Sequence, residues 1–286
     1  MADGADEGIR IIDVTDKSNP ALNPVAFNTG GDARDIKISE REESADYACI
    51  ADYDFGLVMA EISSSDGQLS LSSNTFTGIG NARAVAVYYL IDNDTPHYYA
   101  AVVDNNRLTI VDISDPVDPQ IRDSINASGA RDVAVSYPYA AVAAGSAGIR
   151  VFDISNPGNL EEVGEEPFAT NAPAEAVSMY ASYIHAAVGH SGIVVIGISD
   201  TDPPELTPID LDPDEEVDPY YNTPGSASDI FIAERQGRRY TYVADNYGGF
   251  LSIVHEDRFV EGIYEQPFTE SPDDSARIEC FITSLF

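Results

Sequence analysis

Three aspartates at one place in a repeated segment are the first candidates for chemistry. Each lies two residues after an alanine: Asp35, Asp132 and Asp229. Three arginines directly follow the alanine of such segments: Arg34, Arg83 and Arg131. Alternating charges at a channel mouth would bind a polar ligand or an ion. The alternative is structural, with each aspartate accepting backbone amides between repeats and an arginine pairing with it. Because the acids recur with the repeat, we favour the structural role.

The four histidines offer weaker evidence for chemistry. His185 and His190 are five residues apart, at places where another repeat carries alanine and serine. Two such histidines are more often incidental than metal ligands. We still keep His185 with the three aspartates, because together they would suit a metal-dependent hydrolase or lyase at a central channel. No Gly-x-Ser-x-Gly, His-Glu-x-x-His or phosphate-binding loop motif occurs in the sequence, so no catalytic residue is assigned.

An acidic insertion at residues 210–218 is the candidate metal site. It holds six acids in nine residues and no base. Calcium prefers six to eight oxygen ligands, which four aspartates would help to supply: Asp210, Asp212, Asp214 and Asp218. The EF-hand pattern requires glycine where this segment has Glu215, and Pro213 interrupts the chain. A solvated acidic loop is therefore favoured over a calcium site, and calcium is the one cofactor considered.

A short apolar run, which ends in most copies in an acid and a turn, recurs along the sequence and predicts the fold. Its six copies lie at residues 9–13, 57–61, 108–112, 149–153, 193–197 and 251–255, and their starts are 41 to 58 residues apart. Each repeat has four strand-sized pieces: an alternating first strand, an alanine-rich second strand, the recurring run, and a short polar edge strand. Four strands repeated at this period are typical of β-propeller blades.

We therefore predict an all-β, six-bladed β-propeller with four-stranded antiparallel blades. The blade repeats begin near residues 33, 82, 130, 174, 227 and 275, within one domain that spans residues 1–286. Residues 275–286 resemble a first strand and residues 1–22 hold the first copy of the run, so both termini are expected to complete the last blade. A segment cut from a longer repeat array is the alternative.

Two further residue groups have mainly structural interpretations. The recurring run often closes on an acid before serine or threonine, which typically caps local backbone amides: Asp13, Glu61, Asp112 and Asp153. The two cysteines, Cys49 and Cys280, each lie in a predicted strand and are interpreted as small buried hydrophobic residues. Two isolated cysteines make metal binding improbable.

The charge balance limits the partners that the protein can have. The chain has 49 acids, 15 bases and a formal net charge of −34. Such a surface repels nucleic acid and anionic lipid, remains hydrated in high salt and suits a halophilic or extracellular setting. No apolar run reaches the roughly 18 residues needed for a membrane helix, and residues 1–7 lack the features of a signal peptide.

The run Leu-Thr-Ile-Val-Asp at residues 108–112 resembles the LVIVD-repeat family. That resemblance implies a β-propeller found mostly in surface or secreted proteins of bacteria and archaea, with adhesive or binding roles. We therefore expect a non-enzymatic, extracellular or cell-surface scaffold that binds a protein or glycan partner at a loop face. The alternatives are the metal-dependent hydrolase or lyase and a self-assembling subunit of a surface layer or filament. No nucleic-acid partner or membrane insertion is expected.

Overall fold

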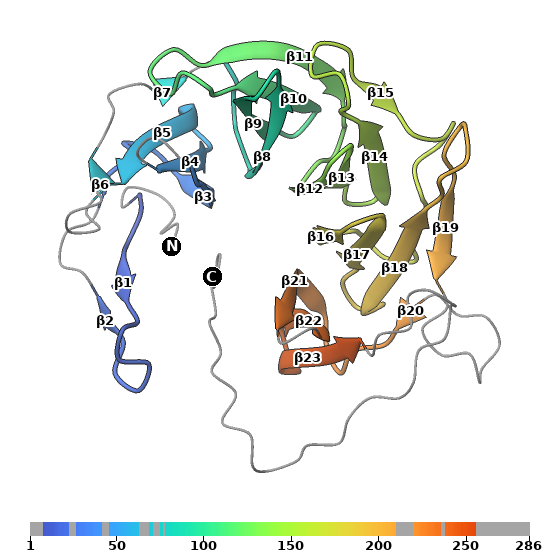
Figure 1. Cartoon of the computed structure of the whole chain (residues 1–286). Coiled ribbons are helices and arrows are strands. Elements are labelled where there is room, and N and C mark those ends of the chain that lie inside the picture. Colours follow the sequence, from blue (N-terminus) through green and yellow to red (C-terminus); the bar gives the residue numbers. More distant parts are fainter. Residues whose placement is uncertain are drawn as a thin grey trace. The chain divides into compact units, whose positions relative to one another are not determined.

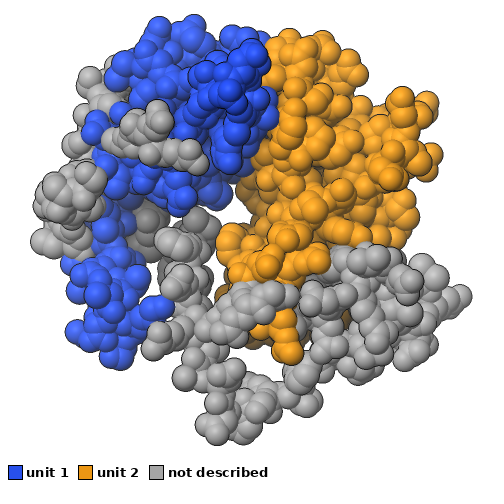
Figure 2. Space-filling model, in the orientation of Figure 1, with its two compact units in different colours: residues 1–124, 271–286 blue, residues 125–270 orange. Residues whose placement is uncertain are grey.

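A computed structural model describes residues 8–22, 27–41, 46–62, 69–70, 75–76, 78–209, 220–235 and 238–255. The regular secondary structure of these residues consists of β-strands (Figure 1). The chain divides into two compact units, residues 1–124 with 271–286 and residues 125–270 (Figure 2). No helix that could cross a membrane is found in the described parts of the chain.

The first unit contains two blade-like antiparallel sheets. One sheet consists of β3 (Ala33–Ser39), β4 (Tyr47–Asp52), β5 (Gly56–Ile62), β6 (Leu69–Ser70) and β7 (Thr75–Phe76). The other runs in the order β11-β10-β9-β8, from β8 (Ala84–Asp92), β9 (Thr95–Val103), β10 (Arg107–Asp112) and β11 (Gln120–Asn126), and β11 crosses the division between the units. Contacts between β3 and β8 place the first strands of the two blades side by side.

The second unit contains three blades. The first is formed by β12 (Asp132–Ser136), β13 (Tyr139–Ala143), β14 (Ile149–Asp153) and β15 (Glu161–Glu162). The second is formed by β16 (Ala176–Tyr180), β17 (Tyr183–Ala187), β18 (Ile193–Ile198), β19 (Leu206–Ile209) and β20 (Tyr220–Tyr221). The third is formed by β21 (Ala227–Arg235), β22 (Arg238–Asp245) and β23 (Gly249–His255), and the first strands contact one another in the order β12, β16, β21.

Alanine-rich second strands allow neighbouring blades to approach closely. Ala141 and Ala143 of β13 are fully buried in one apolar cluster with Ile184 of β17 and Ile196 of β18. A methyl group fills little space, so the larger side chains of the next sheet occupy the volume between the sheets. Cys49 of β4 has the same role in the first unit, where it is a free, fully buried thiol, and burial raises its pKa to about 12.

The prediction of six blades is wrong, because the structure has a β-propeller fold with five. The N-terminal copy of the apolar run does not enter a four-stranded sheet. Ile9 makes an isolated bridge to Phe27, and within the described part of the chain the two-residue strands β1 (Ile12–Asp13) and β2 (Ala21–Leu22) pair only with each other. The first and second strands that would extend this copy into a blade are missing from the described residues, and residues 275–286, which were expected to contribute, lie outside them.

Candidate interaction surface

The first-strand aspartates hydrogen-bond to backbone amides of neighbouring blades. Asp35 accepts the Val85 N–H of β8 at 3.0 Å, and Asp132 accepts the Val177 N–H of β16 at 2.8 Å. The other carboxylate oxygen of each aspartate accepts the N–H of the following residue, as does an oxygen of Asp229. First strands lie at the edge of their sheets, so these carboxylates satisfy amides that have no partner strand on that side.

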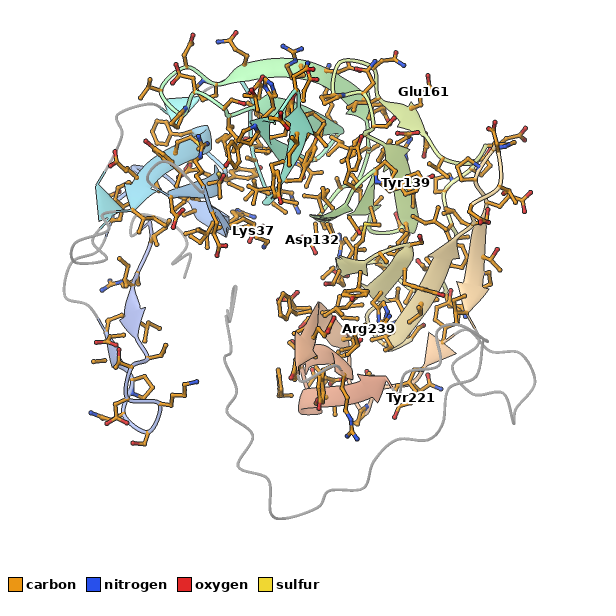
Figure 3. The ribbon with its side chains drawn as sticks, in the orientation of Figure 1. Lys37, Asp132, Tyr139, Glu161, Tyr221 and Arg239 are labelled. Carbon is orange, nitrogen blue, oxygen red and sulfur yellow. The ribbon has the colours of Figure 1, made fainter. Side chains whose placement is uncertain are left out.

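The nearby basic side chains pair mainly with other acids. Arg34 donates to Asp32 at 2.6 Å, and Arg131 donates to Glu175 of the next blade. Asp35 instead pairs with Lys37, whose ammonium lies 3.1 Å away (Lys37 and Asp132 are labelled in Figure 3). Arg83 is half-buried, and its Nε has no hydrogen-bond partner among the residues that the structure describes.

His185 lies in the interior of the second unit. Its side chain is 2% exposed on β17, and its Nδ1 is 2.9 Å from the hydroxyl of the buried Thr241 on β22. The two residues therefore form a polar contact between neighbouring blades. Ser178 of β16 makes a second polar contact across these blades by accepting the Ile232 N–H of β21 at 3.1 Å.

Among the described residues, no group of three or more His, Cys, Asp or Glu side chains is arranged to hold a metal ion. The four aspartates of the proposed calcium loop lie outside the described residues: Asp210, Asp212, Asp214 and Asp218. Calcium binding there stays a prediction. Cys280 also lies outside the described residues.

Three of the four acids that close the recurring run cap the turn after it, as predicted, and the turn that would follow Glu61 lies outside the described residues. Asp13 accepts the Thr15 N–H at 2.9 Å, and the equivalent bonds from Asp112 and Asp153 reach the serine two residues later at 3.0 and 2.8 Å. An aspartate that bonds an amide two residues on forms an Asx turn. These side chains therefore stabilise the exit from the strand.

The β8–β9 hairpin is longer than the predicted strand at residues 82–87. Pairing continues from Val87↔Ala100 to Asp92↔Thr95, and the turn residues Asn93 and Asp94 have φ of 48° and 62°. Tyr89 and Ile91, on the same face of the extension, are 59% and 68% exposed. On the opposite face the rings of Tyr88 and Tyr99 stack with centroids 5.3 Å apart. An ordered hairpin thus presents two large apolar side chains to solvent.

Arg41 attaches this hairpin to the preceding blade. It follows β3, is 8% exposed, and donates to the carbonyl oxygens of Ile113 at 2.6 Å and Ser114 at 3.1 Å. Its guanidinium also lies 4.9 Å from the ring centroid of Tyr47 and 4.5 Å from that of Tyr98. Burial lowers the pKa of Arg41, but an arginine remains charged at neutral pH. A cation between two aromatic rings holds the base of the hairpin in place.

The β21–β22 hairpin is also long, but the residues at the connected ends of its two strands include three arginines: Arg235, Arg238 and Arg239. Arg235 pairs with Arg238 in the strand register, and Glu234 pairs with Arg239. The Arg239 guanidinium lies 4.7 Å from the ring centroid of Tyr180 on the neighbouring blade, and Figure 3 shows it on the side of the sheet that faces β16 and β17. The Tyr180 hydroxyl donates to Glu234 at 2.9 Å, and this hydrogen bond, together with the charge of Glu234, raises the pKa of Tyr180.

The sequence analysis missed both hairpin tips and Arg41. A signal was present in residues 88–92, Tyr-Tyr-Leu-Ile-Asp, where the apolar pattern continues beyond the predicted end of the strand. Another was the segment 235–239, Arg-Gln-Gly-Arg-Arg, which has three of the 15 bases in five positions. Arg41 carried no such signal, because its carbonyl partners follow it by more than 70 residues.

Solved structures support the fold. A chain titled "BBS1N in complex with ARL6DN, soaked with lead" matches with a TM-score of 0.57 and 9% identity, over 90% of this chain and 74% of that chain. A second crystal, soaked with mercury, matches with the same TM-score and identity over 84% and 70%. At this identity the likeness concerns the fold alone. No curated protein matches the sequence significantly.

The sequence itself matches a family model described as "LVIVD repeat". The matched segments are residues 2–25, 30–75, 97–126 and 128–165. They include the first four copies of the recurring run, and the last two segments cover most of the blades that contain β8–β11 and β12–β15. LVIVD repeats are associated with β-propellers, in agreement with the five blades. These matches show that the chain contains LVIVD repeats between residues 2 and 165, and the fold is a β-propeller.

Proposed function

We propose that this protein is a binding scaffold that recognises a partner protein through the β8–β9 hairpin. The observation that carries the proposal is the exposure of Tyr89 and Ile91 on one face of a regular, paired hairpin. The structural neighbour BBS1N, which shares the fold, was crystallised with a protein partner, ARL6DN, and this adds plausibility to a protein ligand.

The composition of the hairpin suits a protein interface. Tyrosine is enriched among the residues that dominate binding energy, since it buries a large area while losing little side-chain entropy. Strand pairing and Arg41 already order the hairpin before a partner arrives, so little further entropy is lost on binding. The formal charge of −34 favours a partner with a positive surface around an apolar pocket.

Site-specific photo-crosslinking tests this proposal. A photoreactive phenylalanine analogue replaces Tyr89 in one variant and Ile121, which is exposed on β11, in a control. We expect a protein adduct from position 89 in extracts of the source cells and none of the same mass from position 121. The adduct partner, once purified, should bind Tyr89→Ala and Ile91→Ala at least about tenfold more weakly than the parent. Equal adducts at both positions would contradict a role for the hairpin.

The proposed setting is extracellular or rich in salt, and its support is the excess of 49 acids over 15 bases. Repulsion among these charges weakens the fold at low ionic strength, and salt screens it over about 10 Å at 0.1 M. The melting temperature should therefore rise between 10 mM and 2 M potassium chloride. A flat profile would argue against a high-salt setting.

A further inference from the structure

The sheet formed by β21, β22 and β23 (Figure 1) has two different faces. One face is buried against the preceding blade, where Ile230 and Val243 lie in an apolar cluster with residues of β16, β17 and β18. Side chains alternate between the faces of a sheet, so Phe231 and its register partner Tyr242 lie on the other face. Phe231 is 58% exposed, and Phe250 on the same face is 47% exposed. We call this the aromatic face, and its rings are those of Phe231, Tyr240, Tyr242 and Phe250.

The equivalent positions of the other four blades carry buried side chains. Phe250 lies at the start of the third strand, and the residues at its place are aliphatic and at most 1% exposed: Leu57, Leu108, Ile149 and Ile193. The residues at the place of Tyr242 are at most 2% exposed: Cys49, Ala101, Ala141 and His185. In the β12–β15 blade, Ala141 and Ile149 pack with side chains of the next sheet in one apolar cluster. The aromatic face therefore occupies a position that packs against another sheet elsewhere in the molecule.

Large and small side chains alternate on the aromatic face. The rings of Tyr240 and Tyr242 have centroids 6.0 Å apart and are inclined by 12°, and those of Tyr242 and Phe250 are 5.5 Å apart and inclined by 19°. These three nearly parallel rings form a row. Each has a small cross-strand partner, and these partners are Ala233, Ser252 and Ala244. A row of rings beside a row of small side chains is a shape that a second such face can fill.

The aromatic face also carries opposite charges at its two ends. Arg239 stacks on Tyr180 of the preceding blade, so Arg238, which is exposed, lies on the aromatic face beyond Tyr240. Asp229 lies on the same face at the other end, where its register partner is Ala244. Six residues of β22 separate Ala244 from Arg238, which corresponds to roughly 20 Å along the strand.

We propose that the aromatic face binds the same face of a second copy of this chain, forming a dimer with two-fold symmetry. A two-fold axis that runs across the strands in the plane of the interface reverses the strand direction. It therefore brings Arg238 of each copy to the end that carries Asp229 of the other, and it sets Phe231 opposite Ala233. An axis along the strands would instead bring like charges together. This surface is different from the β8–β9 hairpin and the inference does not depend on that hairpin.

The dimer is expected to be weak and to depend on salt. Three strands about 4.8 Å apart over roughly 20 Å make a small contact, whereas stable complexes bury about 800 Å² on each partner. Two chains with a formal charge of −34 repel each other, and salt screens this repulsion over about 10 Å at 0.1 M. Ion pairs at the rim of an interface add little affinity and mainly fix orientation. Screening therefore dominates, and the affinity should rise with salt.

Sedimentation velocity of the full chain in 10 mM and 2 M potassium chloride tests the inference. The test variant is Phe231→Ser with Phe250→Ser. The control variant is Val117→Ser with Ile121→Ser, at two apolar residues that are 53% and 47% exposed in the other unit. We expect the parent to sediment as a monomer at low salt and as a dimer in 2 M salt at high protein concentration. The dissociation constant should rise at least about tenfold in the test variant and less than about threefold in the control.

Photo-crosslinking of the purified protein in 2 M potassium chloride identifies the contact itself. A photoreactive phenylalanine analogue replaces Phe231 in one protein and Ile121 in a control. We expect position 231 to give an adduct with twice the mass of the chain, joined to residues 227–235 or 238–253 of the second copy, and position 121 to give none. A parent that stays monomeric in 2 M salt, or an equal loss of dimer in both serine variants, would overturn the inference. An adduct from position 231 within a single chain would overturn it in favour of a segment of the same chain.

Discussion

The β8–β9 and β21–β22 hairpins have nearly the same length but opposite tip chemistry. Their strands span nine and nine residues in one hairpin, and nine and eight in the other. The first carries exposed Tyr89 and Ile91 beside the acidic turn, whereas the second places Arg235 opposite Arg238. Backbone pairing sets the reach of each hairpin, and the residues near the tip set the charge and polarity that it presents.

The two hairpins are also held to their neighbours by different physical means. The β8–β9 hairpin depends on a buried cation, Arg41, which contacts two carbonyl oxygens and two aromatic rings. The β21–β22 hairpin has two polar contacts in its paired region, between His185 and Thr241 and between Ser178 and Ile232, and its charged contacts with Tyr180, from Glu234 and Arg239, lie near the solvent. A buried charge without its partners costs more free energy than a buried neutral group, so the first attachment is the more vulnerable to substitution.

The largest effect is therefore expected from Arg41→Ala. The substitution removes both hydrogen bonds and leaves the buried Ile113 carbonyl and the partly buried Ser114 carbonyl without the guanidinium. We expect the free energy of unfolding to fall by about 3 kcal/mol, measured by chemical denaturation. The control is Arg34→Ala, since Arg34 is an exposed arginine stacked on Tyr53, and its loss should cost less than about 1 kcal/mol. Equal losses would contradict the role given to Arg41.

Equivalent aspartates at the end of the second strand should differ in the same way. Asp245 accepts four backbone N–H groups at 2.7 to 3.1 Å, from Gly225, Ser226, Tyr247 and Gly248. Asp104 of the other hairpin accepts two, from Asn106 and Arg107. Asparagine would place an NH₂ donor against backbone N–H donors. We therefore expect Asp245→Asn to lower the free energy of unfolding by about 2 kcal/mol and Asp104→Asn to lower it by about half as much. Chemical denaturation of both variants gives the comparison.

The contribution of Asp245 should depend on pH. Burial raises its pKa, but the nearby Thr223 hydroxyl and the amides of Gly248, Tyr247 and Gly225 lower it to about 2, from 3.8. The Thr223 hydroxyl makes no hydrogen bond of regular geometry, so the amides are the firmer cause. A carboxyl group whose pKa is lower in the folded than in the unfolded protein stabilises the fold at pH values above its unfolded pKa. This contribution is lost as the pH falls through the folded pKa. The difference in free energy of unfolding between the parent and Asp245→Asn should therefore become smaller from pH 4 to pH 2.

A smaller loss is expected from Thr241→Val. Valine keeps the shape of threonine but removes the hydroxyl that lies 2.9 Å from His185 Nδ1. The loss of one buried hydrogen bond should lower the free energy of unfolding by about 1–2 kcal/mol. The matched control is Thr109→Val in β10, at a threonine that is 5% exposed in the other unit, where a smaller change is expected. A larger loss at Thr109 would show that shape, and not the contact with His185, determines the cost.

The local sequence pattern predicted strands well but the number of blades poorly. The second strands at Tyr47–Asp52 and Tyr139–Ala143 begin at the tyrosines that were predicted to open them, because the alternation and the flanking turns are local properties. The sixth blade was inferred by counting copies of the apolar run. A copy becomes a blade only when other strands pair with it, and the copy near Ile9 makes one isolated bridge. Period alone carries no information about that pairing.

The candidate surfaces were harder to predict, because they depend on where along a strand the side chains stop being buried. Apolar residues at 88–91 are typical of a buried strand, yet Tyr89 and Ile91 are exposed because this hairpin continues after the residue pair Val87↔Ala100. Arg41 was likewise unpredictable, since its contacts cross more than 70 residues of sequence. The repeated aspartates were identified from the sequence because each occupies a fixed place in the repeat, as Asp35 and Asp132 show.

The smallest expected effect is a gain in stability from Arg238→Glu. Arg235 and Arg238 are register partners at the ends of β21 and β22, so Arg238→Glu puts opposite formal charges at a register position that now has two like charges. Such pairs contribute roughly 0.2–1 kcal/mol, so the free energy of unfolding should rise by a few tenths of a kcal/mol. Arg107→Glu adds the same negative charge at an exposed site and should leave stability unchanged or slightly lower it, because the chain is already acidic. Thermal melting of the two variants at 0.15 M salt measures the difference between them. A loss of stability in Arg238→Glu larger than that in Arg107→Glu would mean that Arg238 supports the hairpin itself, and the expected benefit of opposite charges at this register position would then be contradicted.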